Sequence, residues 1–391
     1  MTEWKEELKA LAQQAVKDRR YLHANAELSF EETGTAAFLR EKLAACGVEF
    51  EEGYSGNSVV CCLTGAEDGP TIAFRADIDA LPIQEDNDLP YCSKNDGVMH
   101  ACGHDAHTAV LLAMVRFFAA HRELIRGKIK FIFQQAEEKL PGGAVTLCRE
   151  GVMEDVDEIY AWHAAAIQPI GEVSLVRGHS HAAVGEYRLV IKGKGGHGGF
   201  PHLSNNPILC AASVANIINQ MITTRVDPLK SGVITTAYIH SGTDHVPNVI
   251  PSECILGGNI RTLDNALIEK MYEWTEQICR TQCEAFGCEY EFEIGRGYPS
   301  TELGGHPMEV MEAVAAEMGL VNTIPFPQMG AEDFSYYTLK KPAAFIMIGM
   351  QDPRDKENPT PHHNPRFRID DENGLPVALE FIVSCYLKAV S

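Results

Sequence analysis

The segment MHACGHDAH brings one thiol and three imidazoles together, at Cys102, His100, His104 and His107. Thiolate and imidazole are preferred zinc ligands, and such a pair can also act as nucleophile and base. Cys102 and His104 are two residues apart, so their side chains share a face in an extended loop but diverge by about 200° in a helix. We therefore expect this pair to precede the helix predicted from DAHTAVLLAMVRFFAAH and to bind metal, with His107 supporting a ligand and His100 structural.

Two adjacent glutamates, Glu137 and Glu138, follow the apolar strand pattern KIKFIFQ. Neighbouring side chains on a regular strand point to opposite faces, so both can face one site only where the strand ends. The sequel KLPGGA predicts such an end. One carboxylate can then bind metal while the other holds an attacking water as general base.

Polar side chains also follow three other apolar runs: Asp77 and Asp79 after TIAFRA, His163 in EIYAWH, and His362 and His363 beyond AAFIMIGM. Ligands of open α/β sheets bind at the carboxyl ends of the strands, so we expect these groups to converge. Carboxylates, imidazoles and a thiol in one place need a compensating positive charge. A divalent cation supplies it, with zinc first and manganese, cobalt or nickel as alternatives.

The order of the strand and helix patterns that must position these groups changes twice along the 391-residue chain. Residues 1–182 and 299–391 alternate short apolar runs with helical patterns, which predicts an α/β catalytic domain with a mostly parallel sheet and helices on both faces. Residues 183–298 follow the order strand, helix, strand, strand, helix, strand. That order is typical of a small α+β domain with a four-stranded sheet and two helices, here inserted into the larger one.

The composition excludes several partners. Acidic residues outnumber basic ones by 54 to 33, and a net charge of −21 makes nucleic acids and anionic membranes unsuitable. The longest apolar run, near AVLLAMV, is too short to span a membrane. Twelve cysteines and a beginning without an apolar signal stretch predict the reducing cytoplasm.

Motifs in order from residue 23 to residue 367 resemble the metallo-aminoacylase family, which includes hippurate hydrolases, auxin-conjugate amidohydrolases and relatives of the glutamate carboxypeptidases and succinyl-diaminopimelate desuccinylase. The matching stretches are HANAELSFEE, FRADIDALPIQE, MHACGHDAHTA, QQAEEKLPGGA, WHAAAIQPIGE, GKGGHGGFPHLSNNPI, PNVIPSECILGGNIRTLD, MGAEDFSYY and HHNPRF. The resemblance implies two divalent metal ions. The implied ligands are Cys102, His104, Glu138, His163 and His363.

The resemblance also assigns roles around these ligands. It makes Glu137 the general base and proton shuttle, and Asp79 the group that orients a metal ligand. Asp77 stands where some relatives carry a metal-binding histidine. His363 is preferred to His362 because it stands two residues before a proline, as the family's histidine does.

In the inserted domain, His197 resembles a histidine that crosses a dimer interface to polarise the scissile carbonyl, and His202 is the alternative. The resemblance therefore implies a homodimer, or a higher homo-oligomer, formed through this lid or dimerisation domain. The residues implied to bind the substrate are Asn248, Arg261, Gly330 and Ala331.

The implied activity is hydrolysis of the amide bond of an N-acyl or N-aroyl amino acid, a small molecule, to a carboxylic acid and a free amino acid. A dipeptidase or carboxypeptidase, or an N-acyl-diaminopimelate deacylase, would use the same chemistry. Two alternatives belong to other classes: a hydrolase with Cys102 as nucleophile and His104 or His107 as base, and a non-catalytic binder of amino-acid conjugates. The two-residue separation disfavours the first alternative, and the presence of Glu137 disfavours the second.

Overall fold

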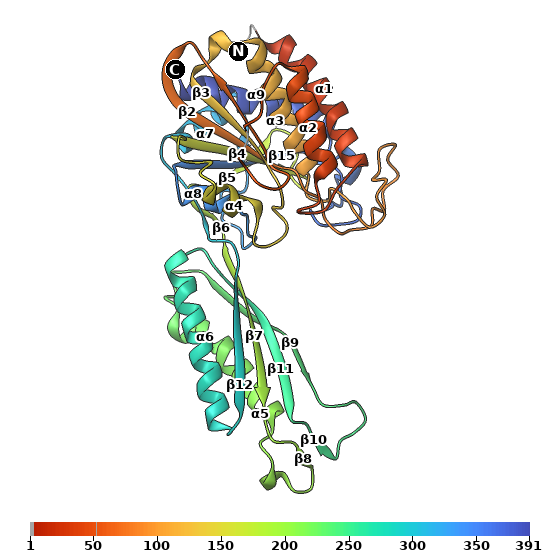
Figure 1. The fold of residues 1–391 in the computed structure, drawn as a ribbon, viewed down its shortest axis with the longest axis vertical. Coiled ribbons are helices and arrows are strands. Elements are labelled where there is room, and N and C mark those ends of the chain that lie inside the picture. The colour runs from red at the N-terminus through yellow and green to blue at the C-terminus, as the bar shows by residue number, and fades with distance from the viewer. Residues whose placement is uncertain (1–3, 52) are drawn as a thin grey trace. The chain divides into compact units, whose positions relative to one another are not determined.

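The structure, a computed structural model, describes residues 4–51 and 53–391. Residues 1–3, at the start of the predicted catalytic domain, lie outside the described residues. The chain divides into two compact units (Figure 1). Unit 1 consists of Met1–Gly178, Glu302–Phe326 and Asp333–Ser391, and unit 2 of His179–Thr301 and Pro327–Glu332. The short segment 327–332 thus groups with unit 2, although the sequence pattern puts it in the last part of the catalytic domain.

Unit 1 is built on a seven-stranded sheet. Its strands are β1 (Val59–Thr64), β2 (Glu67–Asp77), β3 (Arg126–Gln134), β4 (Glu158–Ala165), β5 (Glu172–Leu175), β14 (Val321–Asn322) and β15 (Ala343–Gly349). They lie in the order β1-β3-β2-β4-β15-β5-β14. The central neighbours β3, β2, β4 and β15 are parallel, whereas β1 and β5 pair antiparallel with β3 and β15. The predicted mostly parallel α/β sheet is confirmed.

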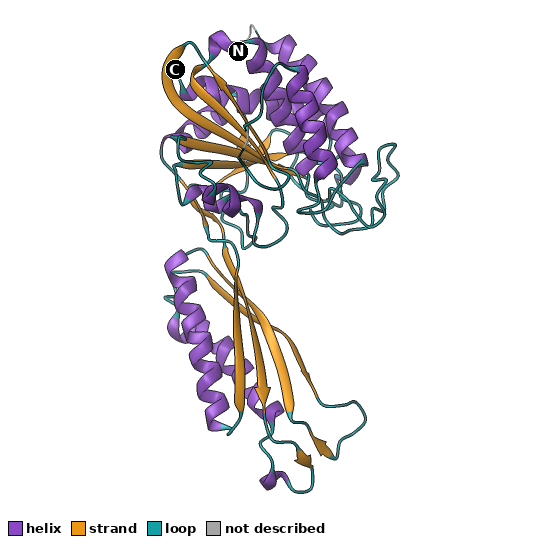
Figure 2. Ribbon diagram, viewed as in Figure 1, coloured by secondary structure: helices purple, strands orange, loops and turns teal. Residues whose placement is uncertain are grey.

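Helices cover both faces of this sheet, which is why every residue of β4 is buried (Figure 2). The helices of unit 1 are α1 (Lys5–Ala24), α2 (Thr33–Ala45), α3 (His104–Ala120), α4 (Gly143–Arg149), α7 (His306–Glu317), α8 (Ser335–Thr338) and α9 (Asp371–Ala389), with 3-10 turns η1 (Arg122–Leu124) and η3 (Pro353–Asp355). α3 packs on β2, β3 and β4, while α9 packs on β15 and contacts α1, α3 and α7. This packing holds the start of α3 at the carboxyl ends of the central strands.

Unit 2 contains an antiparallel four-stranded sheet in the order β12-β7-β11-β9. Its elements are β7 (Ala183–Lys192), α5 (Pro207–Arg225), β9 (Gly232–Ser241), β11 (Glu253–Thr262), α6 (Asn265–Ala285) and β12 (Glu289–Arg296). Both helices begin at side-chain caps, Asn206 and Asp264. Short pieces complete the chain: β8 (Gly196–His197) pairs with β10 (Val249–Ile250), β6 (Gly178–His181) with β13 (Thr301–Leu303), and η2 spans Pro201–Leu203.

A hydrophobic core joins the helices of unit 2 to one face of its sheet. Alternate residues of β7, Tyr187, Leu189 and Ile191, are buried there with residues of α5 and α6. This period of two is what the sequence pattern predicts for a half-covered sheet. Across the described ranges, none of the helices combines the length and apolar character needed to cross a membrane.

Candidate metal centre

Five side chains from four parts of unit 1 form two overlapping groups. Cys102, His104 and His163 make one group, and Cys102, Glu138 and His363 make the other. Within each group the possible ligand atoms lie within 4.8 Å of one another. The Cys102 sulfur belongs to both groups, so it lies where one thiolate could bridge two ions. These are the five residues that the family resemblance implies as ligands.

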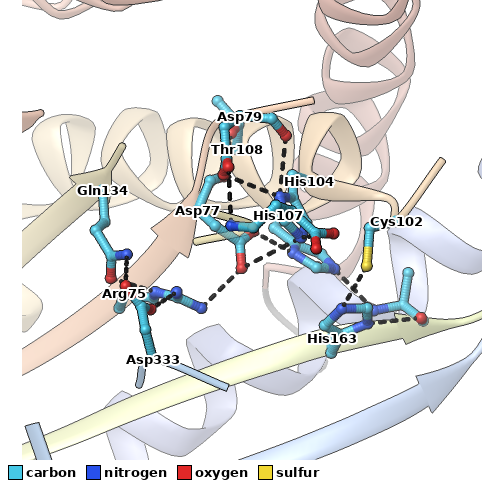
Figure 3. A network of polar contacts seen from close by, with 12 residues as sticks. Arg75, Asp77, Asp79, Cys102, His104, His107, Thr108, Gln134, His163 and Asp333 are labelled. Atoms are coloured by element: carbon cyan, nitrogen blue, oxygen red, sulfur yellow. Dashed lines mark hydrogen bonds and ion pairs between the residues drawn. The ribbon is translucent and has the colours of Figure 1, made fainter. Parts of the chain in front are cut away.

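Cys102 and His104 flank Gly103, whose φ of 96° makes the turn into α3. This left-handed conformation favours glycine, because a side chain there would be strained. Cys102 precedes the helix and His104 is its first residue, so the pair lies at the start of α3, where the two-residue spacing does not make the side chains diverge as it would inside the helix. The Cys102 sulfur lies 3.5 Å from Nε2 of His163 on β4 (Figure 3).

His104 has one occupied and one unoccupied ring nitrogen. Its Nδ1 lies 3.0 Å from the Asp79 carbonyl oxygen and 3.3 Å from Asp79 Oδ1, so Asp79 orients the ring. Its Nε2 is buried without a hydrogen-bond partner, which a bound cation would supply. Burial opposes protonation, yet the carboxylates of Asp77, Asp79 and Glu138 outweigh it and raise the pKa of His104 to about 10. The site therefore attracts positive charge.

His163 is held in a tautomer suited to ligation. Its Nδ1 donates to its neighbour's carbonyl oxygen, on Ala164, at 2.8 Å. Its Nε2 then carries the lone pair and faces the Cys102 sulfur. Burial lowers the pKa of His163 well below its usual value, so the ring stays neutral. A neutral imidazole with a free lone pair is a metal ligand.

His107 is used at both ring nitrogens (Figure 3). The Ala164 amide donates to its Nε2 at 2.9 Å, so Nδ1 carries the proton and donates to Asp77 Oδ1 at 2.5 Å. Arg75 donates to the other Asp77 oxygen at 2.7 Å. Asp77, His104 and His107 are also close enough to hold a cation, but these hydrogen bonds occupy His107. His107 therefore connects α3 to the backbone beside His163, in the supporting role expected from the sequence.

The two adjacent histidines near the C-terminus have different surroundings. His362 Nε2 donates to the Ala164 carbonyl oxygen at 2.7 Å. His363 Nε2 instead lies 3.0 Å from Glu138 Oε1. The His363 backbone has a φ of 61° and its amide donates to the Ala101 carbonyl oxygen at 2.8 Å. The structure thus places His363, and not His362, beside the acidic candidate ligand.

Glu137 and Glu138 face the same group of atoms, together with His104. β3 ends at Gln134, and Ala136 has a φ of 52°, so the backbone reverses its alternation just before the pair. The Glu138 amide donates to Asp79 Oδ2 at 3.0 Å, which fixes the far side of the turn. The predicted strand end is present, but the left-handed residue that turns both carboxylates inward has no sequence signal.

The predicted residues of unit 2 form two separate sets. His197 and Asn248 line a groove of about 870 Å³ with Glu253, the first residue of β11. Arg261 lies near the other end of β11, where it donates to the Met329 carbonyl oxygen at 2.5 Å, next to Gly330 and Ala331. The nine residues from Glu253 to Arg261 span about 26 Å of extended strand. His202 lies in η2, near His197 in the chain.

Known proteins resemble this chain over most of its length. Residues 73–387 match the sequence model of peptidase family M20/M25/M40. An N-acyl-L-amino acid amidohydrolase of Geobacillus stearothermophilus is 41% identical over 75% of this chain and 80% of its own. The N-acetylcysteine deacetylase of Bacillus subtilis is 33% identical over 95% and 96%. The crystal structure of a dinuclear metal-binding M20 peptidase from Bacillus subtilis has a TM-score of 0.84 at 30% identity, covering 98% of this chain and 99% of that one.

Proposed function

Because the chain belongs to peptidase family M20/M25/M40 and is a hydrolase of that family, we propose that it cleaves the amide bond of N-acyl or N-aroyl amino acids. The observation that carries this proposal is the pair of ligand groups that share Cys102. Thiolate, imidazole and carboxylate suit zinc first, with manganese, cobalt or nickel as alternatives. The ligands would be Cys102, His104, Glu138, His163 and His363.

The side chains around this centre have different roles in hydrolysis. Divalent ions, when held there, would polarise a carbonyl and acidify a water molecule. Glu137, beside His104 and Glu138, takes the proton of the attacking water and returns it to the leaving amine. Asp79 holds the His104 ring in place. His197 donates a hydrogen bond to the oxyanion, and the substrate carboxylate binds Asn248, Arg261 and the backbone at Gly330 and Ala331.

The cysteine-nucleophile alternative has little support in the surroundings of Cys102. Burial, together with the carboxylates of Glu138 and Glu137, raises the pKa of this thiol well above its usual value. A reactive cysteine needs the opposite shift. Of its two suggested bases, His107 has both nitrogens occupied, and His104, whose pKa is raised to about 10, already carries a proton at pH 7 and cannot take that of the thiol. Metal binding, in contrast, would deprotonate the thiol directly.

A substrate panel tests the proposal. The enzyme is stripped with EDTA, reloaded with zinc, manganese or cobalt, and assayed with N-acetyl and N-benzoyl amino acids, dipeptides, glutamyl conjugates and N-succinyl-diaminopimelate. We expect kcat/KM for an N-acyl or N-aroyl amino acid to exceed that for dipeptides by about tenfold or more, a difference of about 1.4 kcal/mol. Preference for a dipeptide would identify a peptidase, and turnover by the stripped enzyme would favour the cysteine mechanism. Binding of these conjugates without turnover would indicate a non-catalytic binder of amino-acid conjugates.

We also propose a homodimer formed through unit 2. β12, one edge of its sheet, carries Glu289, Glu291 and Glu293, charges that oppose pairing with another strand. The other edge, β9, has no acidic residue, lysine or arginine, and exposes Tyr238 and Ile239. A long uncharged edge strand is a template for a second strand. The separation along β11 between Arg261 and the groove that holds His197 supports the same proposal, because both residues of one protomer could not contact one small substrate.

Mixing two inactive variants checks this arrangement. In a heterodimer of Glu137→Gln and His197→Ala, one site combines the intact Glu137 of one protomer with the intact His197 of the other. Random pairing yields heterodimers as half of the dimers, so co-expression should restore about a quarter of the wild-type activity per protomer. If His197 acts within its own protomer, the mixture stays inactive. Light scattering should give twice the 43.0 kDa of the chain.

For the compartment we propose the cytoplasm. Cys210 and Cys283 lie on α5 and α6 with their sulfur atoms 3.8 Å apart, as thiols. Extracytoplasmic compartments oxidise thiols to disulfides, whereas the cytoplasm keeps them reduced. Free thiols in contact favour the reducing compartment.

A further inference from the structure

Backbone strain is concentrated around the two adjacent glutamates and the segment that contacts them. Within residues 4–51 and 53–391, positive φ values at non-glycine residues occur at Phe30, Ala136, His245 and His363. Ala136 precedes Glu137, His363 belongs to the candidate ligands, and Phe30 lies two residues before Glu32. Left-handed backbone at such residues persists only where the surroundings hold it in place. The contacts that hold Ala136 therefore also decide the direction of Glu137.

Buried carboxylates hold the amides on both sides of Glu137. The Ala136 amide donates to Glu32 Oε1 at 2.8 Å, and the Glu138 amide donates to Asp79 Oδ2 at 3.0 Å. Glu32 and Asp79 are both buried, with at most 1% of their surface exposed. Glu137 thus lies between two residues, Ala136 and Glu138, whose amides are each fixed by an acidic side chain.

The main-chain group that the Glu32 side chain holds is the Ala136 amide. The other Glu32 oxygen accepts a hydrogen bond from Asn57 Nδ2 at 3.0 Å. In the part of the chain that the structure describes, no cationic side chain forms an ion pair with it. Burying a carboxylate without a cation is unfavourable, and here burial raises the pKa of Glu32. A residue in so costly a position is expected to do something that a neutral apolar side chain would not.

We propose that Glu32 is a positioning residue for Glu137, because its carboxylate holds Ala136 in the left-handed conformation that turns Glu137 toward His104 and Glu138. The same segment also contacts the second carboxylate, since Ser29 donates to Asp79 Oδ2 at 2.6 Å. Residues 29–32, just before α2, thus brace both sides of the turn. This inference rests on the proposed role of Glu137 as the general base.

The test compares three variants on the best substrate of the panel above. Glu32→Ala should lower kcat by about 100-fold, the loss expected when a catalytic group is misplaced by about 1 Å. KM should change less than about threefold and metal content should remain that of the wild type. Glu32→Gln keeps an acceptor for the Ala136 amide and should recover most of kcat. Asn57→Ala removes the hydrogen bonds to the other Glu32 oxygen and to the Phe30 carbonyl oxygen but leaves the contact with the Ala136 amide, so it is the matched control and should have a smaller effect than Glu32→Ala.

A second-site substitution separates positioning from general destabilisation. Glycine adopts positive φ without the strain that alanine has, so Ala136→Gly should restore kcat of Glu32→Ala by about fivefold or more. A loss that follows only from a weakened α2 would not respond. Thermal melting identifies variants that fail to fold. Unchanged kcat in Glu32→Ala, with kcat lost in Glu137→Gln, would overturn the positioning role and leave the proposed function intact.

A crystal structure of the Glu32→Ala variant tests positioning without any assay of activity. We expect residue 136 to leave the left-handed region and the Glu137 carboxylate to turn away from His104. If φ at residue 136 stays positive in that variant, Glu32 does not hold the turn. This result is decisive even if no substrate of the panel is cleaved.

Discussion

Replacing Glu137 with glutamine is expected to lower kcat by about 10³-fold while the bound metal stays at the wild-type level. General acid–base catalysis contributes about 10²- to 10⁴-fold to the rate, and glutamine has the shape of glutamate but cannot accept the water's proton. KM should change little, because the loss occurs in the transition state. The measurement is steady-state kinetics together with metal analysis of the same preparation.

The neighbouring residue provides a matched control. Glu138 lies 3.0 Å from His363 and shares a ligand group with Cys102, so Glu138→Gln should lower metal content as well as kcat. The two substitutions remove the same chemical group from adjacent positions. If Glu137→Gln released metal and Glu138→Gln retained it, the two roles would be reversed. Equal effects of both on metal content would remove the case for a separate base.

Removing the metal is expected to abolish turnover, by about 10³-fold or more, and zinc, manganese or cobalt should restore it. Metal uptake should also release protons. In the metal-free site burial and nearby carboxylates raise the pKa of the Cys102 thiol, and the pKa of His104 is raised to about 10. Both groups are therefore protonated at pH 7 and must lose a proton to bind metal. Affinity should rise with pH between 6 and 8, by about tenfold per pH unit for each proton released.

Titration of the stripped protein in weak buffer measures those protons directly. Cys102→Ser should release fewer protons and bind metal more weakly, because a hydroxyl is a poor ligand for zinc. Affinity that falls as pH rises through this range would contradict the assignment of Cys102 and His104 as ligands. Full activity after removal of metal would falsify the metal-dependent mechanism as a whole.

Much of the candidate site could be read from residue types and their positions at strand ends. Cys102 and His104 lie at the start of a helix, and Glu137 and Glu138 follow a strand that stops, so local patterns are enough to predict that they share a site. Strand ends far apart in the chain converge because the parallel sheet places them along one edge. The family resemblance then selected His363 over its neighbour, a choice that the local pattern leaves open.

The residues that hold these groups in place were missed for physical reasons. Glu32 accepts a hydrogen bond from the Ala136 amide and Arg75 donates to Asp333 as well as to Asp77, and a sequence does not show which distant amide or carboxylate a side chain will meet. Positive φ at Ala136 has no signal either, since alanine is common in every kind of element. Glu32 is the last residue of the motif HANAELSFEE, which matches the family, but the motif does not show that its carboxylate binds the Ala136 amide.

The position of β15 in the sheet has a consequence for synthesis of the protein. Unit 2 is almost continuous in sequence and can fold as soon as its residues leave the ribosome. The sheet of unit 1 cannot, because β15 lies between β4 and β5 and is translated only after the whole of His179–Thr301. Until then the nascent chain exposes the apolar edge of β4, a template for aggregation. A premature stop after Thr301 would remove β15 from inside the sheet together with the edge strand β14.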